Sequence, residues 1–538
     1  MSTVHAGHSP LQIYSTLTRR KEAFQPLEPG KVRMYNCGPT VNNYFHVGNA
    51  RNFVVADMIR RYLEYRGYHV TFVQNITDIE DKIIARAREE GCTAEEIAEK
   101  YTKVFFDSAA RLGVREADHH PRATEYVGKM VALIKKLESK GFAYAVDGDV
   151  YFRVSRFADY GKLSGRKLED LLSGARVEVS EKKESPGDFA LWKAAKEGEP
   201  SWPSPWGKGR PGWHIECSVM AMDLLGETFD IHMGGTDLIF PHHENEIAQS
   251  EAATGKPFAR FWVHNGFLNI NGEKMSKSLG NFFTINQVLE KFEAPVVRYF
   301  LLSAHYRVPL DFSDSALHEA KTALTRLRTA RAAARYMGDG AEPDFENPLV
   351  VARISEIRRA FEEGMDDDFN TPRALAALFE GAGQINKMES QSAGKPLTDE
   401  SRRTAASLCA LMDELAADVL GLDVKKKRIV ATGHLVISAP TVSGEGSKIG
   451  HGTGDVILPA LQASGERVKI PAEAPALIKQ LAARGEEEER LMIQLIQIRA
   501  EARKQKNFAL GDQIRSGLAE LGFELLDRPG GVTEWKRK

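Results

Sequence analysis

A strand, a long helix and a second strand follow one another within residues 31–77, and this order constrains the fold more than any other feature. Residues 31–37 (KVRMYNC) have the composition of a strand. Residues 50–67 predict a helix, because apolar residues recur at intervals of four and Gly67 can end it. Residues 69–77 (HVTFVQNIT) predict the second strand. This unit predicts an α/β fold with a parallel sheet.

The composition and the hydrophobic periodicity of the remaining chain change several times, which predicts more than one domain. Residues 229–235 and 261–270 predict further strands of the same sheet, and from about residue 315 the sequence becomes helical and rich in Ala, Leu and Arg. The predicted parts are an α/β domain over 1–314 with an insertion at about 118–228, a helical bundle over 315–424, a flexible linker or insertion over 425–473 and a small C-terminal module over 474–538.

The composition is that of an ordinary globular protein, with 42% hydrophobic and 27% charged residues among 538. The 72 basic and 74 acidic residues give a net charge of −2, which neither indicates nor excludes a nucleic-acid partner. Four cysteines are too few for a disulfide framework and favour a reducing compartment. No apolar signal segment and no run of roughly 18 apolar residues is present, so we expect a cytoplasmic protein without membrane contact.

One stretch, PHHENEIAQSEAA (241–253), predicts a helix that opens with Pro241 near its first position. His242 and Glu246 are four residues apart and therefore share a helix face. His243 falls on another face, where we expect it to pack. An imidazole and a carboxylate at this spacing are two candidate ligands for Zn²⁺.

Two of the four cysteines provide candidate sulfur ligands. Cys37 ends the first predicted strand and Cys217 lies in GWHIECSVMA, so that Cys37, Cys217, His242 and Glu246 would form a set of two sulfurs, one nitrogen and one oxygen. A single buried cysteine is usually a small core residue. The set gains weight only from its combination with candidate phosphate-binding motifs.

The first candidate phosphate motif is NGEKMSKSLGN (271–281), which places Lys274 and Lys277 in a Ser- and Gly-containing loop. Two lysines on such a loop can neutralise the charge that develops on a polyphosphate in the transition state. A solvated basic loop is the simpler interpretation of this motif by itself.

The second candidate motif is His46-Val47-Gly48-Asn49, between the first strand and its helix. In α/β sheets ligands bind at this position, and a helix N-terminus attracts anions. His46 and Asn49 can donate hydrogen bonds to phosphate oxygens, and Gly48 lets a flat base approach the backbone. The simpler interpretation is a turn with a solvent-facing histidine.

Together these motifs resemble class I aminoacyl-tRNA synthetases, whose signatures are His-Ile-Gly-His and Lys-Met-Ser-Lys-Ser. KMSKS (274–278) is an intact match, whereas HVGN differs at Val47 and Asn49. Within the class the chain resembles cysteinyl-tRNA synthetases, from about residue 10 to the C-terminus. The stretches that carry this resemblance are YNCGPTVNNYFHVGNAR, GWHIECSVMA, FPHHENEIAQS, EKMSKSLGN and RYFLLSAHYRVPLDFS.

The resemblance implies a Rossmann-like catalytic domain with an inserted connective domain, a helical bundle that contacts tRNA and a C-terminal anticodon-binding module. It assigns the zinc ligands to Cys37, Cys217, His242 and Glu246, and places Thr77 and Trp213 around the amino acid. HMGGTDL (232–238) departs from the family's usual run of three glycines. The remaining implied residues are His46, Gly48, Asn49, Lys274 and Lys277 for ATP binding, of which all but Gly48 are also catalytic, and Arg503, Asp512 and Asp527 for anticodon contact.

The implied reaction joins L-cysteine to tRNA(Cys) with ATP and Mg²⁺, and one Zn²⁺ per chain selects the substrate thiolate. No protein nucleophile is needed, so catalysis is mostly positioning and charge stabilisation. Trp535, followed by three basic residues, suits stacking on a splayed base. The resemblance favours a monomer.

Two alternatives remain. A cysteine ligase of the mycothiol pathway resembles the same catalytic half, but such enzymes lack the anticodon module that RAEARKQKNFALGDQIRSGL and LLDRPGGVTEW match. A catalytically silent, zinc-stabilised RNA-binding protein is the other alternative. Intact Lys274, Lys277 and His46 argue against it.

Overall fold

The fold is that of a computed structural model, which divides into two compact units at residues 426 and 427. Each unit is described by itself. The residues that the structure describes are 10–166, 182–270, 273–274, 283–392, 396–425, 433–435, 495–496, 499, 508–520, 523–528 and 532–537.

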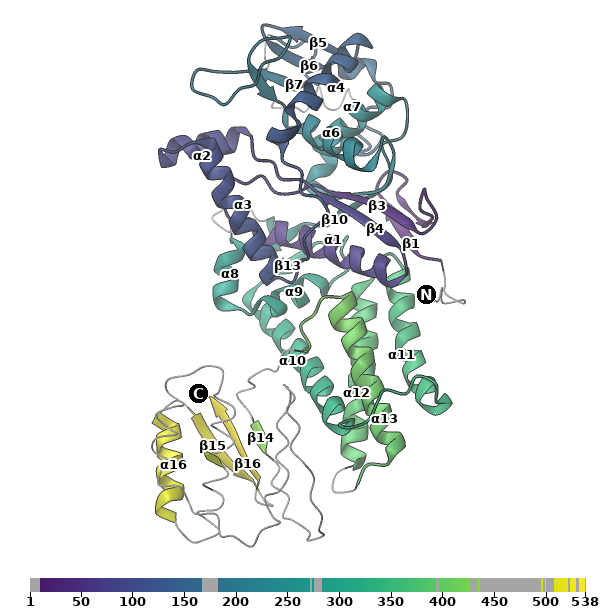
Figure 1. Cartoon of the computed structure of the whole chain (residues 1–538), viewed down its shortest axis with the longest axis vertical. Coiled ribbons are helices and arrows are strands. Elements are labelled where there is room, and N and C mark those ends of the chain that lie inside the picture. Colours follow the sequence, from purple (N-terminus) through teal and green to yellow (C-terminus); the bar gives the residue numbers. More distant parts are fainter. Residues whose placement is uncertain are drawn as a thin grey trace. The chain divides into compact units, whose positions relative to one another are not determined.

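The catalytic part of the first unit is built on a four-stranded parallel sheet with the order β10-β9-β3-β4 (Figure 1). Met34 on β3 lies opposite Ile231 on one neighbour and Phe72 on the other. The strands are β3 (Lys31–Asn36), β4 (His69–Gln74), β9 (Phe229–Gly235) and β10 (Ala259–Asn265). The predicted α/β class with a parallel sheet is confirmed.

Helix α1 (Val47–Tyr65) connects β3 to β4 and begins three residues before the predicted start. The reason is a capping box: Nδ1 of His46 accepts from the Asn49 backbone N–H at 3.2 Å, and Oδ1 of Asn49 accepts from the His46 N–H at 3.4 Å. Gly67, with φ of 85°, follows the helix in the left-handed conformation that glycine adopts without strain.

The predicted strand over 261–270 is wrong in one respect, because the chain forms two strands there in different sheets. After β10, strand β11 (Leu268–Ile270) pairs with β12 (Glu273–Lys274) and β13 (Leu310–Phe312). The break falls at Gly266, whose N–H donates to the carbonyl of Tyr306 at 2.8 Å. A Cβ there would lie 2.6 Å from the Arg307 carbonyl oxygen, so only glycine permits this crossing.

Between α3 (Ala94–Arg111) and β9 the chain forms a second, antiparallel sheet with the order β5-β6-β7-β8. Its core contains the buried side chains of Phe152, Leu191 and Trp192. Helices α4, α6 and α7 contact one another beside this sheet (Figure 1). Helix α7 follows β9 in the chain. The elements are α4 (Val127–Ser139), β5 (Ala143–Val146), β6 (Asp149–Phe152), β7 (Phe189–Ala194), β8 (Gly209–Pro211), α6 (Trp213–Leu225) and α7 (Glu244–Thr254).

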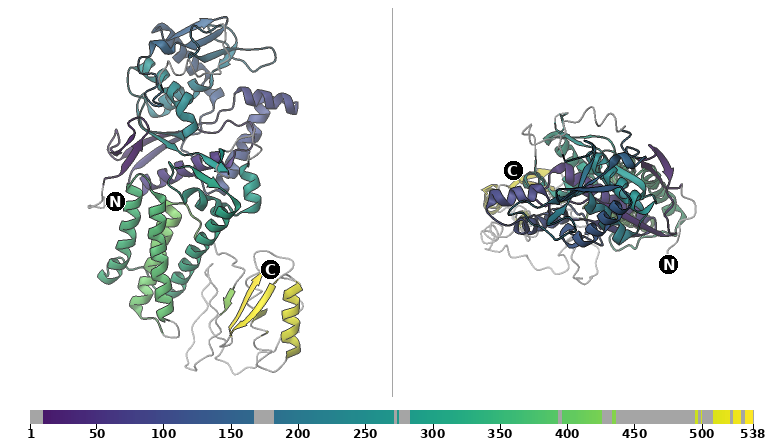
Figure 2. Two further views of the ribbon diagram at one scale, coloured as in Figure 1. Left: turned by 180° about the vertical axis from the view of Figure 1, so that it is seen from behind. Right: turned by 90° about the horizontal axis from the view of Figure 1, so that it is seen from above.

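Four long segments after the catalytic domain form a helical bundle, in which α10 contacts α12 and α13, and α11 contacts α12 (Figures 1 and 2). They are α10 (Asp314–Met337), α11 (Pro348–Asp366), α12 (Thr371–Ser392) and α13 (Asp399–Met412), which continues into η6 (Asp413–Val419). The other elements of the first unit are β1 (Gln12–Ser15), β2 (Arg20–Ala23), α2 (Asp81–Glu90), α3 (Ala94–Arg111), η1 (Ala123–Tyr126), η2 (Val154–Arg156), α8 (Ile285–Lys291) and α9 (Ala294–Leu302).

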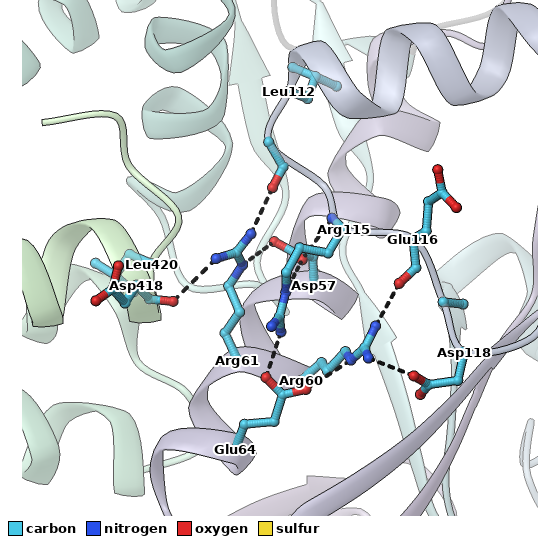
Figure 3. A network of polar contacts seen from close by, with 12 residues as sticks. Asp57, Arg60, Arg61, Glu64, Leu112, Arg115, Glu116, Asp118, Asp418 and Leu420 are labelled. Carbon is cyan, nitrogen blue, oxygen red and sulfur yellow. Dashed lines mark hydrogen bonds and ion pairs between the residues drawn. The ribbon is translucent and has the colours of Figure 1, made fainter. Parts of the chain in front are cut away.

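A buried ion network joins α1 to α9, to the segment after α3 and to the end of the bundle (Figure 3). Asp57 on α1 accepts from Nη2 of Arg298 at 2.5 Å, from Nε of Arg61 at 2.7 Å and from the backbone N–H of Arg115 at 3.1 Å. Nε of Arg298 donates to the carbonyl of Leu420 at 2.9 Å. Through Arg298, the carboxylate of Asp57 therefore connects the helix that starts at the HVGN motif to the end of the bundle.

The second unit contains α16 (Phe508–Glu520) and an antiparallel sheet with the order β14-β16-β15. Strands β15 (Phe523–Arg528) and β16 (Val532–Arg537) form a hairpin. Strand β14 (Gly433–Leu435) pairs with β16, so these three residues of the predicted linker over 425–473 are a sheet strand instead. Across the described residues, every helix is too short or too polar to cross a membrane.

Candidate metal and substrate site

Four buried side chains meet where β3 ends, at the carboxyl ends of the parallel strands. Cys37 follows β3 directly, Cys217 lies on α6, and Glu246 lies on α7 just after His242. One ligand atom from each falls within 4.8 Å of all the others. The structure thus brings together all four residues that the sequence suggested as zinc ligands.

The helix that carries Glu246 begins later than predicted, so that His242 lies just before it. Helix α7 starts at Glu244, and Pro241 belongs to the preceding turn η4 (Ile239–His243). Phe240 interrupts that turn with extended backbone, φ −140° and ψ 131°, which is the conformation favoured before a proline. His242 and Glu246 still face each other, with 3.1 Å between Nε2 and Oε1.

The distances among these atoms match a tetrahedral zinc site. Zn–S bonds of about 2.3 Å place two sulfurs at tetrahedral positions about 3.8 Å apart. The Sγ atoms of Cys37 and Cys217 are 3.9 Å apart. Sγ of Cys37 lies 3.7 Å from Oε1 of Glu246. The four residues therefore fit a tetrahedral ion with mixed ligands.

A second, overlapping set consists of Cys37, His232, His243 and Glu246. The prediction that His243 packs away from the ligands is wrong, because its Nε2 lies 3.2 Å from Sγ of Cys37. Its Nδ1 pairs at 2.8 Å with Nε2 of His264. His232 and His264 were not singled out from the sequence, since neither belongs to a spacing pattern that indicates a metal ligand.

The histidines around the first set hold its ligands in place. Oε2 of Glu246 pairs with Nε2 of His232 at 2.7 Å, which turns Oε1 toward the cysteines. Nδ1 of His242 pairs with Nδ1 of His214 at 2.9 Å, which leaves Nε2 directed at Glu246. Such outer partners orient metal ligands. They favour the set with Cys217 and His242 over the alternative.

The pKa values of two of the four ligands, Glu246 and Cys217, move in the direction that metal binding requires. Burial acts to raise the pKa of Glu246, but the nearby His232 and His242 outweigh it and lower this pKa to about 2. The hydrogen bond from Cys37 is the main cause that lowers the pKa of Cys217 to about 6. Metal ligands bind as thiolate and carboxylate, so both residues are prepared for this role. Burial raises the pKa of Cys37 instead. Burial acts to lower the pKa of His242, but the charge of Glu246 outweighs it and this pKa is raised to about 10.

A chain of hydrogen bonds leads from the sulfur atoms to Thr77. Oδ1 of Asn75 accepts from the N–H of Gly38 at 2.8 Å and lies 3.8 Å from Sγ of Cys217. Nδ2 of Asn75 donates to Oγ1 of Thr77 at 3.2 Å, and this hydroxyl donates to Oε2 of Glu216 at 2.9 Å. Burial raises the pKa of Glu216 well above its ordinary value.

Trp213 lies at the open side of the cluster. Its side chain is 37% exposed, and its ring centroid lies 4.2 Å from that of His242. It is the first residue of α6, so it shares a helical turn with Glu216 and Cys217. The ring can therefore cover a molecule bound at the metal.

The HVGN motif lies beside the segment that follows the KMSKS motif in the chain. The N–H of Val47 donates to the carbonyl of Phe283 at 3.2 Å, and the N–H of Ile285 donates to the carbonyl of Phe45 at 2.9 Å. Phe283 follows the KMSKS loop closely in the chain. Lys274 is the last residue of β12, and Lys277 lies outside the described residues. Gly48 occupies the first turn of α1, between the two capping residues of that helix.

The predicted anticodon residues belong to the second unit, where the structure describes only some of them. Asp512 is exposed on α16, and Asp527 and Trp535 belong to β15 and β16. Arg503 lies outside the described residues. Phe508 was not singled out, although it is 60% exposed at the start of α16. The sequence signal that could have singled out Phe508 is an aromatic residue within a polar, basic stretch.

Comparison with known protein families shows the broad class of enzymes to which the chain is similar. Residues 23–322 match the model of the tRNA synthetases class I (C) catalytic domain, and residues 360–425 match the DALR domain. A methionyl-tRNA synthetase of Mycobacterium tuberculosis bound by methionyl-adenylate has the same fold, with a TM-score of 0.57 at 16% identity over 73% of this chain and 93% of that one. Fold and site together define a class I tRNA synthetase architecture.

Relatives with higher sequence identity show the family within this class. A cysteine–tRNA ligase of Symbiobacterium thermophilum is 49% identical over 98% of this chain and 99% of its own length. A cysteine–tRNA ligase of Caldicellulosiruptor saccharolyticus is 47% identical over 97% and 99%. The chain belongs to the cysteine–tRNA ligase family.

Proposed function

We propose that the chain is a cysteine–tRNA ligase, which activates L-cysteine with Mg-ATP and transfers the cysteinyl group to the 3′ end of tRNA(Cys). The observation that carries the proposal is the buried cluster of Cys37, Cys217, His242 and Glu246 beside the start of α1. A thiol-selecting metal site next to a nucleotide-binding helix end is what this reaction requires.

We further propose that the cluster holds one Zn²⁺. Zinc, when bound, supplies a site for a substrate thiolate and binds an uncharged hydroxyl poorly. An apolar pocket would reject the hydroxyl analogue of cysteine by only about a hundredfold. Cys37 and Cys217 would supply the sulfur ligands, and His232 and His214 would orient Glu246 and His242.

His46, Gly48, Asn49, Lys274 and Lys277 are proposed to bind ATP. The capping box fixes His46 and Asn49 at the helix N-terminus, where the helix dipole favours phosphate. The lysines would neutralise the charge that develops when the carboxylate of cysteine displaces pyrophosphate from the α-phosphate. The backbone pairing of Phe45 and Val47 with the segment after the KMSKS loop supports this assignment.

Thr77 and Trp213 are proposed to contact the amino acid. Thr77 is connected through Asn75 to the sulfur of Cys217, and Trp213 covers His242. In the second unit we propose Arg503, Asp512, Asp527 and Trp535 as anticodon contacts. Its sheet and α16 would form the reading module.

We also propose that the protein acts as a monomer in the cytoplasm. None of the cysteines in the described part of the chain forms a disulfide, which supports a reducing compartment. Sedimentation equilibrium tests the monomer: a mass near 59.7 kDa is expected, and twice that value would contradict it.

ATP–pyrophosphate exchange with cysteine, followed by charging of tRNA(Cys), tests the function. We expect cysteine-dependent exchange without tRNA and transfer of labelled cysteine when tRNA is added. Exchange without transfer to tRNA, but with transfer to an amino-sugar, would favour the mycothiol-pathway ligase. Absence of exchange from zinc-loaded protein would favour an RNA-binding protein without catalysis.

A further inference from the structure

Arg51 on α1 is fully buried, and its partners in the described part of the chain are backbone carbonyls. Its Nη1 donates to the carbonyl of Gly266 at 2.9 Å and to that of Phe267 at 3.0 Å. Its Nη2 donates to the carbonyl of His305 at 3.2 Å, and its Nε has no hydrogen-bond partner among the described residues. The guanidinium thus connects α1 to two other segments of the catalytic domain.

The charge of this side chain is not neutralised by a carboxylate among the described residues. Burial lowers the pKa of Arg51 to about 10, so the guanidinium stays charged at pH 7. Arg61, on the same helix, donates instead to the carboxylate of Asp57 at 2.7 Å. Because a buried charge without an opposite charge is costly, the contacts of Arg51 indicate a role other than stability.

The first two carbonyls belong to the crossing between β10 and β11, where the chain leaves the parallel sheet. Nδ2 of Asn265 also donates to the carbonyl of Gly266, at 3.2 Å. The N–H of Leu310 also donates to the carbonyl of Phe267, at 3.0 Å. A carbonyl oxygen accepts two hydrogen bonds, so Arg51 adds a second donor to each carbonyl. Of these donors, Arg51 is the one that lies on α1.

This crossing leads directly to the strand that carries Lys274. Strand β11 begins immediately after Phe267, and its Asn269 lies opposite Lys274 on β12. The third carbonyl, that of His305, precedes β13, which is the other neighbour of β11 in this sheet. Arg51 therefore holds the start of β11 and the segment that leads to β13.

The same helix carries the HVGN motif at its N-terminus. Arg51 lies about one helical turn after Val47, and the capping box of His46 and Asn49 occupies the turn before it. The N–H of Val47 donates to the carbonyl of Phe283, which follows the KMSKS motif in the chain. The first two turns of α1 are thus attached to the chain on both sides of residues 275–282.

We propose that Arg51 is a positioning residue for adenylate formation, which fixes the strand that carries Lys274 at the distance from the capping box of α1 that the phosphates of ATP require. The inference rests on the proposed function, because it assumes that Lys274 and the capping box bind ATP. Arg51 would act through the backbone of Gly266 and Phe267 and would not contact ATP.

The test measures kcat and KM for cysteine-dependent ATP–pyrophosphate exchange on the zinc-loaded full chain, on Arg51→Met and on Arg51→Lys. Methionine removes the charge, whereas lysine keeps it but replaces the planar fork by one ammonium group. Both variants should lose about tenfold to hundredfold in kcat, since a displacement of about 1 Å at the reacting groups can cost roughly a hundredfold. The KM for cysteine and the zinc content should stay at the values of the unmodified protein.

A double-mutant cycle with Lys274→Ala tests whether Arg51 acts through that lysine. In the Lys274→Ala background, Arg51→Lys should lower kcat further by less than about threefold, because the group that it positions is absent. Arg60→Met is the matched control. Arg60 also lies on α1 and donates to a carbonyl, that of Glu116 at 2.7 Å, but about two and a half turns further along the helix. Its kcat should equal that of the unmodified protein.

An unchanged kcat in Arg51→Met and Arg51→Lys, even with lowered thermal stability, would overturn the inference. Full activity in Arg51→Lys alone would also overturn it, because the charge would then suffice without the fork. Full additivity with Lys274→Ala would overturn the action through that lysine. If Arg51→Met fails to fold, Arg51→Lys alone decides by the same criterion. Absence of exchange from the unmodified zinc-loaded protein would instead refute the proposed function.

Discussion

At the scale of single residues, Cys217 allows the metal proposal to be tested. Serine in its place keeps the size of the side chain but gives a hydroxyl that resists deprotonation. We expect Cys217→Ser to lose most bound zinc and, with it, cysteine-dependent ATP–pyrophosphate exchange. Metal analysis by mass spectrometry and the exchange assay measure both effects.

Cys92 provides the control for this substitution, because it lies outside both candidate ligand sets and is partly exposed. Cys92→Ser should keep about one zinc per chain. Full zinc in Cys217→Ser would contradict the choice of ligands. If Cys217→Ser kept its zinc and His232→Ala lost it, the result would indicate that the overlapping set binds the metal.

The ligand residues show what sequence patterns can and cannot supply at this scale. The spacing of His242 and Glu246 on a helix was sufficient to predict that they face each other, as they do at 3.1 Å. The roles of His232 and His264 could not be predicted in this way. Both lie in buried strands, and their partners Glu246 and His243 come from α7 and from the turn before it, so only the packing of this segment on the sheet reveals them.

At the scale of elements, Asp57 connects helix α1 to α9 and, through Arg298, to the end of the bundle. Burial acts to raise the pKa of Asp57, but the positive charges of Arg298 and Arg61 outweigh it and lower this pKa below its ordinary value. Asp57→Asn leaves Arg298 buried without its partner. We expect a loss of about 3–5 kcal/mol in unfolding free energy at pH 7, measured by urea denaturation.

The pH dependence of this loss has a defined sign. A carboxylate whose pKa is lowered by folding stabilises the native state above its unfolded pKa of about 3.9, and this stabilisation is lost as the pH falls through the folded value. The difference between the unmodified protein and Asp57→Asn should therefore shrink below about pH 4. Asp399→Asn, at an exposed ion pair with Arg402, should leave the unfolding free energy almost unchanged at every pH.

Helix α16 offers a second test at this scale. Phe508 and Asp512 are four residues apart on it, both are exposed, and they therefore share a face. Stacking of one base on an aromatic ring is worth about 1–3 kcal/mol. Phe508→Ala should lower kcat/KM for tRNA charging roughly tenfold or more and leave ATP–pyrophosphate exchange unchanged.

Gln513 is the control for this face, because it is exposed on the same helix but turned away from Phe508 by about 140°. Gln513→Ala should charge tRNA normally. Equal losses in exchange and charging for Phe508→Ala would mean that the residue supports folding and does not contact tRNA.

Sequence patterns predicted the elements unevenly, for physical reasons. Strand β3, helix α1 and strand β4 follow local periodicity and were predicted within a few residues. Strand β14 was missed because three residues in a Gly- and Ser-rich segment carry no period. Its place in the sheet depends on β16, about a hundred residues later in the chain.

At the scale of the whole molecule, the division at residues 426 and 427 separates the proposed cysteine activation from the proposed anticodon reading. The metal cluster, Thr77 and the start of α1 all lie in the first unit, whereas Phe508 and the described anticodon candidates lie in the second. Strand β14 pairs with the C-terminal hairpin, so a cut at 474 would split a sheet. The informative deletion therefore removes residues 427–538.

We expect this truncated chain to retain cysteine-dependent ATP–pyrophosphate exchange within about twofold, because every proposed contact to ATP and cysteine remains. Charging of tRNA(Cys) should fall by about two orders of magnitude or more, since loss of several base contacts at about 1–3 kcal/mol each raises the barrier for the cognate tRNA. Charging of a minihelix that carries only the acceptor stem of tRNA(Cys) is the matched control, and should be equal for the truncated and intact chains. If the truncated chain charged full-length tRNA as well as the intact chain does, the second unit would not be an anticodon reader, and a ligase acting on a small molecule would become the better interpretation of the first.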